Sequence, residues 1–381
     1  MDDQPLIAIL GGGQLGRMLG LAAIPLGFRC RFLDPSPHAG AQQVGELVVG
    51  ELDDPAALSA VAAGAVAVTY EWEGVPAASI EHLMREGHRV APDQHALRAS
   101  QHRGVEKAMF HSLKIATAPY VLVSTRDELR AAITTLGSPA ILKTCTGGYD
   151  GKGQARIAGA HQAELDASAA AAWTTLTQDH EGPHDLVLEG VVPFDRELSV
   201  LAARAEDGTT VVYDLVHNTH VDGILSTSLA PAADCGPALQ QQANGIATRV
   251  LDHLQYVGLI AIELFQVGGE LIANEFAPRV HNSGHHTIEG AATSQFENHI
   301  RAIAALPLGD PSLRGYCAMM NAVGALPNRG AVLGLAGAHF HDYAKAPRAG
   351  RTVGHVNLLA ASEPERAVLV KAYEAAVRSD D

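Results

Sequence analysis

The sequence has few features of a secreted, metal-clustered or membrane-embedded protein. Its four cysteines, at positions 30, 145, 235 and 317, lie far apart, so no CxxC pair exists and neither a zinc knuckle nor a redox dithiol is indicated. No apolar run reaches the length of a membrane span. The acidic start MDDQPLIAILGGG lacks the basic and apolar regions of a signal peptide. We therefore expect a protein of the reducing cytoplasm with no membrane partner.

Basic residues are also scarce. The 381-residue chain carries 27 Lys and Arg against 42 Asp and Glu, a formal net charge of −15. A chain that binds nucleic acid over its whole surface should be basic, so this class is disfavoured. A local basic cluster can still bind a phosphorylated metabolite. The length predicts two or three domains, and the apolar fraction of 47% is typical of a folded globular protein.

The N-terminal part reads as alternating strands and helices. Residues 5–34 give strand, Gly-rich turn, helix and strand, and residues 46–73 add a strand, a helix and a strand. This pattern predicts a parallel sheet in a first α/β domain. Residues 91–115 follow as connecting helices, for which Asp93 and Ser100 are the expected N-caps.

The pattern changes after Pro119. Short strands around helices come first, and a third region with longer strands begins at HDLVLEGVV, residues 184–192. The longer strands alternate or pair as hairpins, so we expect a largely antiparallel sheet. The predicted domain limits are residues 1–98, 99–187 and 188–381, and the fold class is α/β combined with α+β.

The first turn fits the fingerprint of a dinucleotide site. Gly11-x-Gly13-x-x-Gly16 follows a strand and opens a helix, and Asp34 ends the next strand, where an acid that binds ribose would lie. A tight turn in any doubly wound sheet explains the same pattern. A phosphate-bearing ligand at the N-terminus of the helix is the broader expectation.

The stretch KTCTGGYDGKGQ, residues 143–154, is more specific. Lys143 ends a strand, and the glycines that follow allow the backbone N–H groups to approach a polyphosphate. This hairpin could close as a lid that excludes water, with Tyr149 and Asp150 at its tip. The alternative is a surface hairpin with no ligand. Glu189 ends a later strand, and Glu197 follows eight residues on. Either acid could bind the hydroxyl groups of a ribose, or it could be an ordinary strand residue with no ligand.

The segment LIAIELFQVGGELIANEF, residues 259–276, carries a carboxylate pair. A hairpin with a three-residue loop centred on Gly269 would place Glu263 opposite Glu275 on one face of a sheet. Two like charges there would repel unless a cation lay between them, and Mg²⁺ bridging phosphate oxygens meets that need. A two-residue loop would break the register, so the inference depends on the loop.

Two further polar segments follow. Arg279, His281, Asn282 and Ser283 could polarise a transferring phosphoryl group or an acyl oxyanion. The surrounding histidines suggest zinc, but no HExxH or Cys/His spacing supports it. Lys345, Arg348 and Arg351 fall within seven residues of an acidic chain. They predict a phosphate clamp, with a solvated turn as the alternative.

Taken in order along the chain, these motifs resemble a known family. They are the Gly-rich first turn, KTCTGGYDGKGQ, EGVVPFDRELSV, HNTHVDGIL, IELF with NEFAPRVHNSGHH, and KAPRAGRTVGHVNL. Together they cover nearly the whole chain and resemble the N5-carboxyaminoimidazole ribonucleotide synthetases, ATP-grasp enzymes of purine biosynthesis. GGYDGKGQ and NEFAPRVHNSGHH carry most of the specificity, and the first turn carries little.

The resemblance implies an ATP-grasp fold. A Rossmann-like preATP-grasp domain would precede a small lid domain and a C-terminal antiparallel-sheet domain, with ATP between the last two and with Mg²⁺. The positions that match ATP contacts are Arg103, Lys143, Gly148, Tyr149, Asp150, Gly151, Lys152, Gly153, Gln154, Glu189, Val192, Glu197, His220, Asn274 and Glu275. Glu263 and Glu275 match the metal ligands. The positions that match the ribonucleotide side are Gln14, Leu15, Glu71, Lys345, Arg348 and Arg351, with Glu73 competing with Glu71.

The implied reaction is the carboxylation of aminoimidazole ribonucleotide with bicarbonate and ATP, through carboxyphosphate. The implied catalytic residues are Tyr149, Asp150, Arg279, His281, Asn282 and Ser283. The resemblance also suggests a homodimer. The chain departs from the family at Cys145 and Thr146, where basic residues often stand, so some positive charge near the phosphates is missing.

Three alternatives remain open from the sequence. The nearest is a formate-dependent glycinamide ribonucleotide transformylase, a related ATP-grasp ligase. An NAD-dependent oxidoreductase would use Gly11–Gly16 and Asp34, but it leaves the Lys143 loop and the Glu263/Glu275 pair unexplained. A regulator that binds nucleotide without catalysis is the third, although no motif in the metal or lid segments looks eroded.

Overall fold

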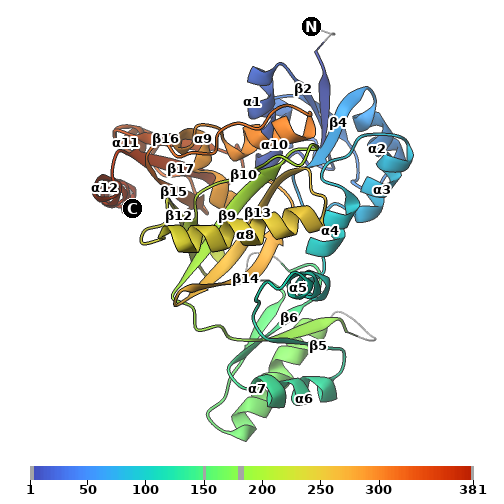
Figure 1. The fold of residues 1–381 in the computed structure, drawn as a ribbon, viewed down its shortest axis with the longest axis vertical. Helices are drawn as coiled ribbons and strands as arrows, with labels where there is room; N and C mark the ends of the chain where they lie inside the picture. Colours follow the sequence, from blue (N-terminus) through green and yellow to red (C-terminus); the bar gives the residue numbers. More distant parts are fainter. Residues whose placement is uncertain (1–3, 149–151, 179–183, 379–381) are drawn as a thin grey trace.

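In a computed structural model the chain forms three β-sheets with helices packed around them (Figure 1). The structure describes residues 4–148, 152–178 and 184–378. Within these ranges no helix combines the length and the apolar composition needed to cross a lipid bilayer. The first domain and the C-terminal region lie side by side at one end of the molecule, and the lid projects from the other.

The first domain contains a four-stranded parallel sheet in the order β3-β2-β1-β4. Its strands are β1 (Leu6–Leu10), β2 (Arg29–Asp34), β3 (Glu46–Val49) and β4 (Ala65–Tyr70). The helical segments are α1 (Gln14–Ala23), η1 (Ile24–Leu26), η2 (Gly40–Gln43), α2 (Pro55–Ala62) and α3 (Ala77–Arg85). β1 is apolar throughout and fully buried, as expected for a parallel strand covered on both faces.

Two short helices lead to the lid, α4 (Gln94–Ser100) and α5 (Arg103–Ser112). Asp93 caps α4 as predicted, because its Oδ1 accepts the backbone N–H of His95 at 2.9 Å. The expected cap at Ser100 is wrong. Ser100 is the last residue of α4, and His102 caps α5 by accepting the N–H of Gly104 at its Nδ1 (3.1 Å).

The lid is a four-stranded antiparallel sheet with two helices on one face. Its elements are β5 (Tyr120–Val123), α6 (Arg126–Leu136), β6 (Ala140–Thr144), β7 (Gln154–Ile157), α7 (Gln162–Thr177) and β8 (Leu186–Gly190). The sequence placed residues 184–192 in the third region, and this is wrong for β8. That strand pairs with β5 and β6, so the limit at residue 188 falls inside a lid strand.

The C-terminal region is built on a nine-stranded antiparallel sheet, which confirms the predicted sheet type. The strand order is β14-β13-β9-β11-β12-β15-β17-β16, and β10 pairs with β9. The strands are β9 (Arg196–Arg204), β10 (Thr210–Val212), β11 (Val216–Val221), β12 (Ile224–Ala230), β13 (Gly258–Val267), β14 (Glu270–Ala277), β15 (Tyr316–Val323), β16 (Ala338–Asp342) and β17 (Thr352–Ala360). The helices are α8 (Pro237–His253), η3 (Asn282–Gly284), α9 (Thr287–Gly290), α10 (Gln295–Ile303), α11 (Arg329–Leu333) and α12 (Glu363–Arg378).

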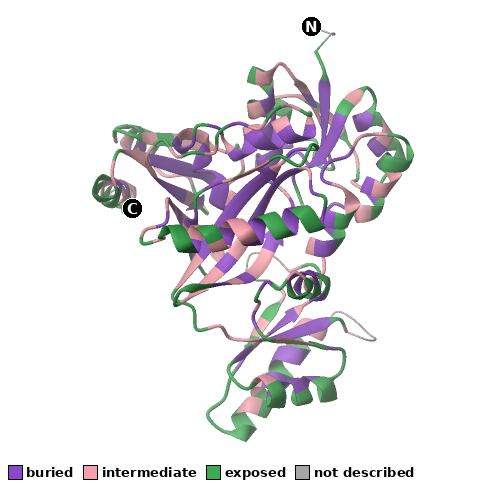
Figure 2. Ribbon diagram, in the orientation of Figure 1, coloured by how far each residue is buried: buried purple, intermediate pink, exposed green. Residues whose placement is uncertain are grey.

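Helices join the large sheet to its neighbours. α8 repeats apolar residues at helical spacing and packs its buried side on β9, β13 and β14 (Figure 2). α10 packs against both β13 and α1, so one apolar core is shared by the first domain and the large sheet. The lid has a separate core that contains Trp173. The lid is therefore attached through its connections and through polar contacts.

Candidate functional site

The Glu263/Glu275 pair exists, but the hairpin that builds it differs from the one expected. The turn between β13 and β14 contains two residues, Gly268 and Gly269, because Val267 pairs with Glu270. The predicted three-residue loop is wrong. A bulge restores the register: Leu264 pairs with Ala273 and Glu263 with Glu275, which leaves Asn274 as the extra residue. The two carboxylates consequently face each other across the ladder.

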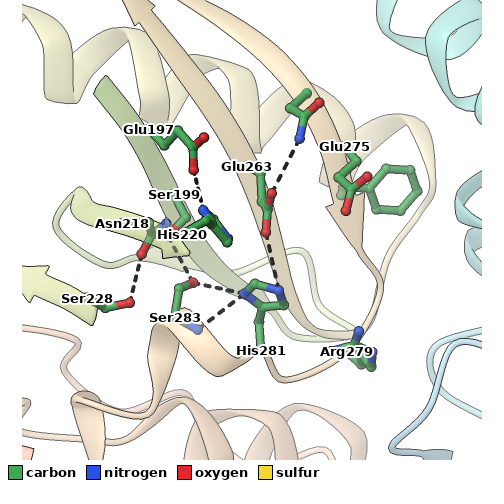
Figure 3. A network of polar contacts seen from close by, with 12 residues as sticks. Glu197, Ser199, Asn218, His220, Ser228, Glu263, Glu275, Arg279, His281 and Ser283 are labelled. Atoms are coloured by element: carbon green, nitrogen blue, oxygen red, sulfur yellow. Dashed lines mark hydrogen bonds and ion pairs between the residues drawn. The ribbon is translucent and has the colours of Figure 1, made fainter. Parts of the chain in front are cut away.

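The surroundings of the two carboxylates are electrostatically unequal (Figure 3). Arg103 Nη1 lies 2.9 Å from Glu275 Oε2, and although burial alone would raise the pKa of Glu275, this guanidinium lowers it. Burial and then the Glu275 carboxylate raise the pKa of Glu263. Glu263 accepts from Asn274 Nδ2 at 3.4 Å, and His281 Nε2 lies 3.5 Å from its Oε1. The pair is thus under like-charge repulsion that a bound cation would relieve.

Lys143 and Glu189 meet in the lid sheet, together with a residue that the sequence did not reveal. Lys143 Nζ donates to Glu189 Oε2 at 2.8 Å, and Lys107 Nζ, from α5, lies 3.0 Å from Oε1. All three side chains are at most 10% exposed. Burial alone would raise the pKa of Glu189, but the two ammonium groups lower it overall. The signal for Lys107 was its helical spacing, since it lies three residues before the buried Phe110.

The hairpin after Lys143 is described only in part. Tyr149, Asp150 and Gly151 lie outside the described residues. At its base, Lys143 pairs with Gln154, and the N–H of Thr144 donates to the carbonyl of Gly153 at 2.9 Å. Gly153 has a φ of +67°, and a Cβ there would lie 2.6 Å from Thr144 Oγ1. Glycine is therefore required at this position. Gly148 and Lys152 border the part that is not described.

Glu197 and His220 face each other from the neighbouring strands β9 and β11. His220 Nδ1 is hydrogen-bonded to Glu197 Oε2. Burial opposes protonation of His220, but this bond raises its pKa overall. Both residues line a small cavity with Glu263 and Asn274. Val192 lies in the segment between β8 and β9, where its carbonyl accepts the N–H of Phe194 at 2.9 Å.

The NEFAPRVHNSGHH segment turns below the carboxylate pair (Figure 3). Arg279 Nη2 forms an ion pair with Glu73 Oε1 at 3.2 Å, which brings the first domain to the site. Burial and then Arg279 lower the pKa of His281 to about 3, so the ring is neutral. Ser283 is fully buried, and the buried Oδ1 of Asn282 has no hydrogen-bond partner. The Ser283 hydroxyl contacts the ring of His281 and accepts from Ser199 Oγ (Figure 3).

The Gly-rich turn is held by two acids. Glu71 accepts the N–H groups of Gly13 (2.8 Å) and Gly16 (3.0 Å). Asp34 accepts the N–H of Gly12 at 2.8 Å. Both carboxylates therefore bond backbone groups of the turn. For Asp34 this use competes with the ribose role that a dinucleotide site would require.

The C-terminal basic loop reaches this turn. Lys345 Nζ donates to Gln14 Oε1, which joins residues 331 positions apart. Leu15, beside Gln14, is buried. On the same loop, Arg351 Nη1 donates to the carbonyl of Ala346 at 3.5 Å, and Arg348 is exposed. The structure thus brings Lys345 to the first turn and leaves Arg348 facing solvent.

One group of metal-type ligands lies elsewhere in the described part of the chain, formed by His102, Cys145 and Asp185. His102 Nδ1 accepts the N–H groups of Gly104 and Val105 (3.1 and 3.3 Å), so its proton lies on Nε2. Nε2 donates to Asp185 Oδ2 at 2.6 Å. A metal at Nε2 would displace that proton, so we assign the group to the capping of α5.

Three family models match the chain. They are the ribonucleotide synthetase preATP-grasp domain over residues 5–101, the ATP-grasp domain over 108–296, and the phosphoribosylaminoimidazole carboxylase C-terminal domain over 317–367. The N5-carboxyaminoimidazole ribonucleotide synthase of Pseudomonas aeruginosa is 44% identical over 98% of this chain and 99% of its own length. The chain belongs to this synthase family. The family resemblance and the ATP-grasp fold predicted from the motifs are confirmed.

Solved structures of the synthase family agree. The enzyme from Thermus thermophilus superposes with a TM-score of 0.91 at 46% identity, covering 97% of this chain and 98% of that chain. The enzyme from Aspergillus clavatus, in complex with ADP and 5-aminoimidazole ribonucleotide, gives a TM-score of 0.89 at 28% identity and covers all of both chains. The Bacillus subtilis synthase is 35% identical over 94% of this chain and 93% of its own length.

Proposed function

We propose that this chain catalyses the ATP-dependent carboxylation of 5-aminoimidazole ribonucleotide with bicarbonate, giving N5-carboxyaminoimidazole ribonucleotide, ADP and phosphate. The observation that carries this proposal is the opposed Glu263/Glu275 pair, with Arg103 on Glu275 and His281 beside Glu263. Arg279, two residues before His281, is held by Glu73 of the first domain. That combination suits a transferring phosphoryl group, whose catalysis is mainly positioning and charge stabilisation.

ATP would bind between the lid sheet and the large sheet. Lys143, fixed by Glu189, presents its ammonium group at the end of β6, and Glu197 with His220 lines the small cavity on the other side. The residues proposed to contact ATP are Arg103, Lys143, Gly148, Tyr149, Asp150, Gly151, Lys152, Gly153, Gln154, Glu189, Val192, Glu197, His220, Asn274 and Glu275. Closure of the Tyr149–Asp150 tip would exclude water from a reactive intermediate.

Glu263 and Glu275 would hold Mg²⁺. The donors are oxygens, as Mg²⁺ prefers, and few protein ligands leave positions for phosphate oxygens. The raised pKa of Glu263, which burial and Glu275 cause, marks a place where a cation is electrostatically favoured. When bound, the ion supplies positive charge to the phosphates of ATP.

The reaction then proceeds in two stages. A bicarbonate oxygen attacks the γ-phosphorus, and the bond to the β–γ bridging oxygen breaks, which releases ADP and leaves carboxyphosphate. The exocyclic amine of the ribonucleotide then attacks the carbon of carboxyphosphate, or of the CO₂ that forms when carboxyphosphate breaks its bond to the phosphate oxygen. In either route the phosphate leaves and takes the amine proton. Arg279 and His281 would stabilise charge on the transferring group. Asn282 would orient bicarbonate through its side-chain amide, whose buried Oδ1 has no other hydrogen-bond partner.

The ribonucleotide would bind against the first turn. Lys345 is already placed there by Gln14, and with Arg351 it would hold the 5′-phosphate. Arg348 would reach the same phosphate from the exposed side of the loop. Leu15 would contact the substrate from the start of α1, and Glu71 or Glu73 would orient the amine. Glu73 also fixes Arg279, and Asp150 is the alternative for the amine.

We also propose that the enzyme works in the cytoplasm as a homodimer. Sedimentation of the purified chain at several concentrations would test the assembly, with a monomer at all concentrations as the contrary result.

The experiment that tests the function is ADP release from MgATP. We expect release to need bicarbonate and to rise with aminoimidazole ribonucleotide. Release only with formate and glycinamide ribonucleotide would replace the proposed substrates while keeping the ligase class. Absence of release under every condition would contradict the proposal.

A further inference from the structure

A continuous network of hydrogen-bonded, buried polar side chains leads to His281 (Figure 3). Ser228 Oγ donates to Asn218 Oδ1 at 2.8 Å, and Asn218 Nδ2 donates to Ser199 Oγ at 3.0 Å. Ser199 Oγ donates to Ser283 Oγ at 2.9 Å, and Ser283 Oγ lies 2.9 Å from His281 Nδ1. This network crosses three neighbouring strands, β12, β11 and β9, and ends at the imidazole ring of His281.

These polar groups occupy positions where apolar residues would be expected. Ser199, Ser228 and Ser283 are fully buried and Asn218 is 4% exposed. Ser199 interrupts the otherwise apolar buried stretch of β9. Burying hydroxyl and amide groups is costly unless each finds a partner. Here each finds one, so the network is fully connected and points to a requirement beyond packing.

The hydrogen bonds to His281 determine the tautomer of its ring. The backbone N–H of Ser283 donates to His281 Nδ1 at 3.3 Å, and a backbone N–H can only donate. Nδ1 therefore carries a lone pair, so the ring is neutral and its proton lies on Nε2. Gln295 fixes the backbone, because its Oε1 accepts the N–H of His281 (2.9 Å) and its Nε2 donates to the carbonyl (2.6 Å).

The donor-to-acceptor direction of the hydrogen bonds in this network agrees with this tautomer. Each hydroxyl between Asn218 and His281 accepts one hydrogen bond and has one proton left to donate, so the last donor, Ser283 Oγ–H, also points at Nδ1. The opposite ring nitrogen, Nε2, faces the site beside Glu263.

We propose that Ser228, Asn218, Ser199 and Ser283 are positioning residues that hold His281 as the Nε2–H tautomer and aim that N–H into the site. There it donates to an oxygen of the anionic reactant. The opposite tautomer would present a lone pair to an anion and repel it. This inference deepens the proposed function and rests on it.

The first test needs no substrate. Two-bond ¹H–¹⁵N correlation spectra of the histidine-labelled protein distinguish the two tautomers and the imidazolium, and loss of one set of signals in His281→Gln assigns His281. We expect the Nε2–H form. An Nδ1–H ring or an imidazolium at neutral pH would overturn the proposal.

The second test removes a hydroxyl from the middle of the hydrogen-bond network. Ser199→Ala should lower kcat about tenfold, the rate equivalent of one hydrogen bond, with KM values for ATP and ribonucleotide within about twofold. The His281 spectrum should show a mixture of tautomers. Ser199→Thr, which keeps the hydroxyl, should restore the spectrum. Ser79→Ala, a buried serine on α3, is the matched control and should change neither readout.

The outcomes separate the two levels of the argument. A wild-type spectrum and an unchanged kcat in Ser199→Ala would overturn the positioning role. If Ser199→Ala does not fold, Ser228→Ala at the far end of the network takes its place, with the same expected mixture of tautomers. An inactive wild-type enzyme that shows the expected tautomers would contradict the proposed function and leave the tautomer assignment standing.

Discussion

Lys107 offers a quantitative test of how the lid is held at the ATP side. Its side chain is 2% exposed, and its Nζ lies 3.0 Å from Glu189 Oε1. Removing one partner of a buried ion pair costs about 3–5 kcal/mol, because the other charge stays buried. In Lys107→Met, Lys143 remains 2.8 Å from the other carboxylate oxygen. We therefore expect the low end of this range, ~3 kcal/mol.

The two tryptophans make a lid-specific assay possible. Trp72 lies after β4 of the first domain, and Trp173 lies in the lid core. In a Trp72→Phe background, urea unfolding followed by fluorescence reports Trp173 alone. With a denaturant slope of about 1–2 kcal/mol per molar, a loss of ~3 kcal/mol lowers the midpoint by roughly 2 M.

An exposed lysine supplies the control for Lys107→Met. Lys371 lies on the outer side of α12 and is exposed, so Lys371→Met makes the same chemical change without disturbing a buried pair. Its midpoint should move by less than about 0.5 M, since surface changes are worth little. Equal shifts in Lys107→Met and Lys371→Met would refute the reasoning that the three charges act as one unit.

Three further results follow from the site. Glu275→Gln should cripple turnover by weakening Mg²⁺ binding; near-normal activity at low Mg²⁺ would contradict the metal assignment. Lys345→Ala should raise the KM for the ribonucleotide far more than the KM for ATP, and an unchanged ribonucleotide KM would place the phosphate elsewhere. Burial alone would raise the pKa of Glu189, but Lys143 and Lys107 lower it below 4.5. The contribution of Glu189 to lid stability is therefore complete above pH 4.5 and is lost as the pH falls through the lowered pKa. Urea midpoints followed by Trp173 fluorescence at several pH values should show this loss, and Glu189→Gln should lack it.

The sheets and the main motifs were predictable because they depend on local patterns. Alternation of strand and helix identified the first domain, and the glycines identified the loop that begins at Lys143. Pairing of β8 with the lid was not predictable, since an apolar strand at a domain limit fits either sheet equally well. Which sheet it joins is decided by tertiary packing.

The pairing of Glu263 with Glu275 was predicted correctly, although the three-residue loop assumed for it was wrong. The sequence supplied Gly268 and Gly269 for a tight turn, and a two-residue turn alone would have put Glu263 and Glu275 out of register. The bulge at Asn274 compensates. Nothing in the letters IANEF marks a bulge, so the pairing could be expected only from the resemblance or from the electrostatic argument.

Residues that act from behind the site were not found in the sequence. Lys107 and Ser199 lie in stretches that read as ordinary helix and strand, and their importance comes from partners 82 and 84 positions away. The contact of Lys345 with Gln14 spans nearly the whole chain. Long-range contacts of this kind require the fold.

The most direct measurement of the central claim uses bicarbonate labelled with ¹⁸O. If bicarbonate oxygen attacks the γ-phosphorus, one labelled oxygen must leave with the phosphate. We expect phosphate that carries one ¹⁸O for each N5-carboxyaminoimidazole ribonucleotide formed, detected by mass spectrometry. Product formation with unlabelled phosphate would contradict the carboxyphosphate route and, with it, the role assigned to the Glu263/Glu275 site.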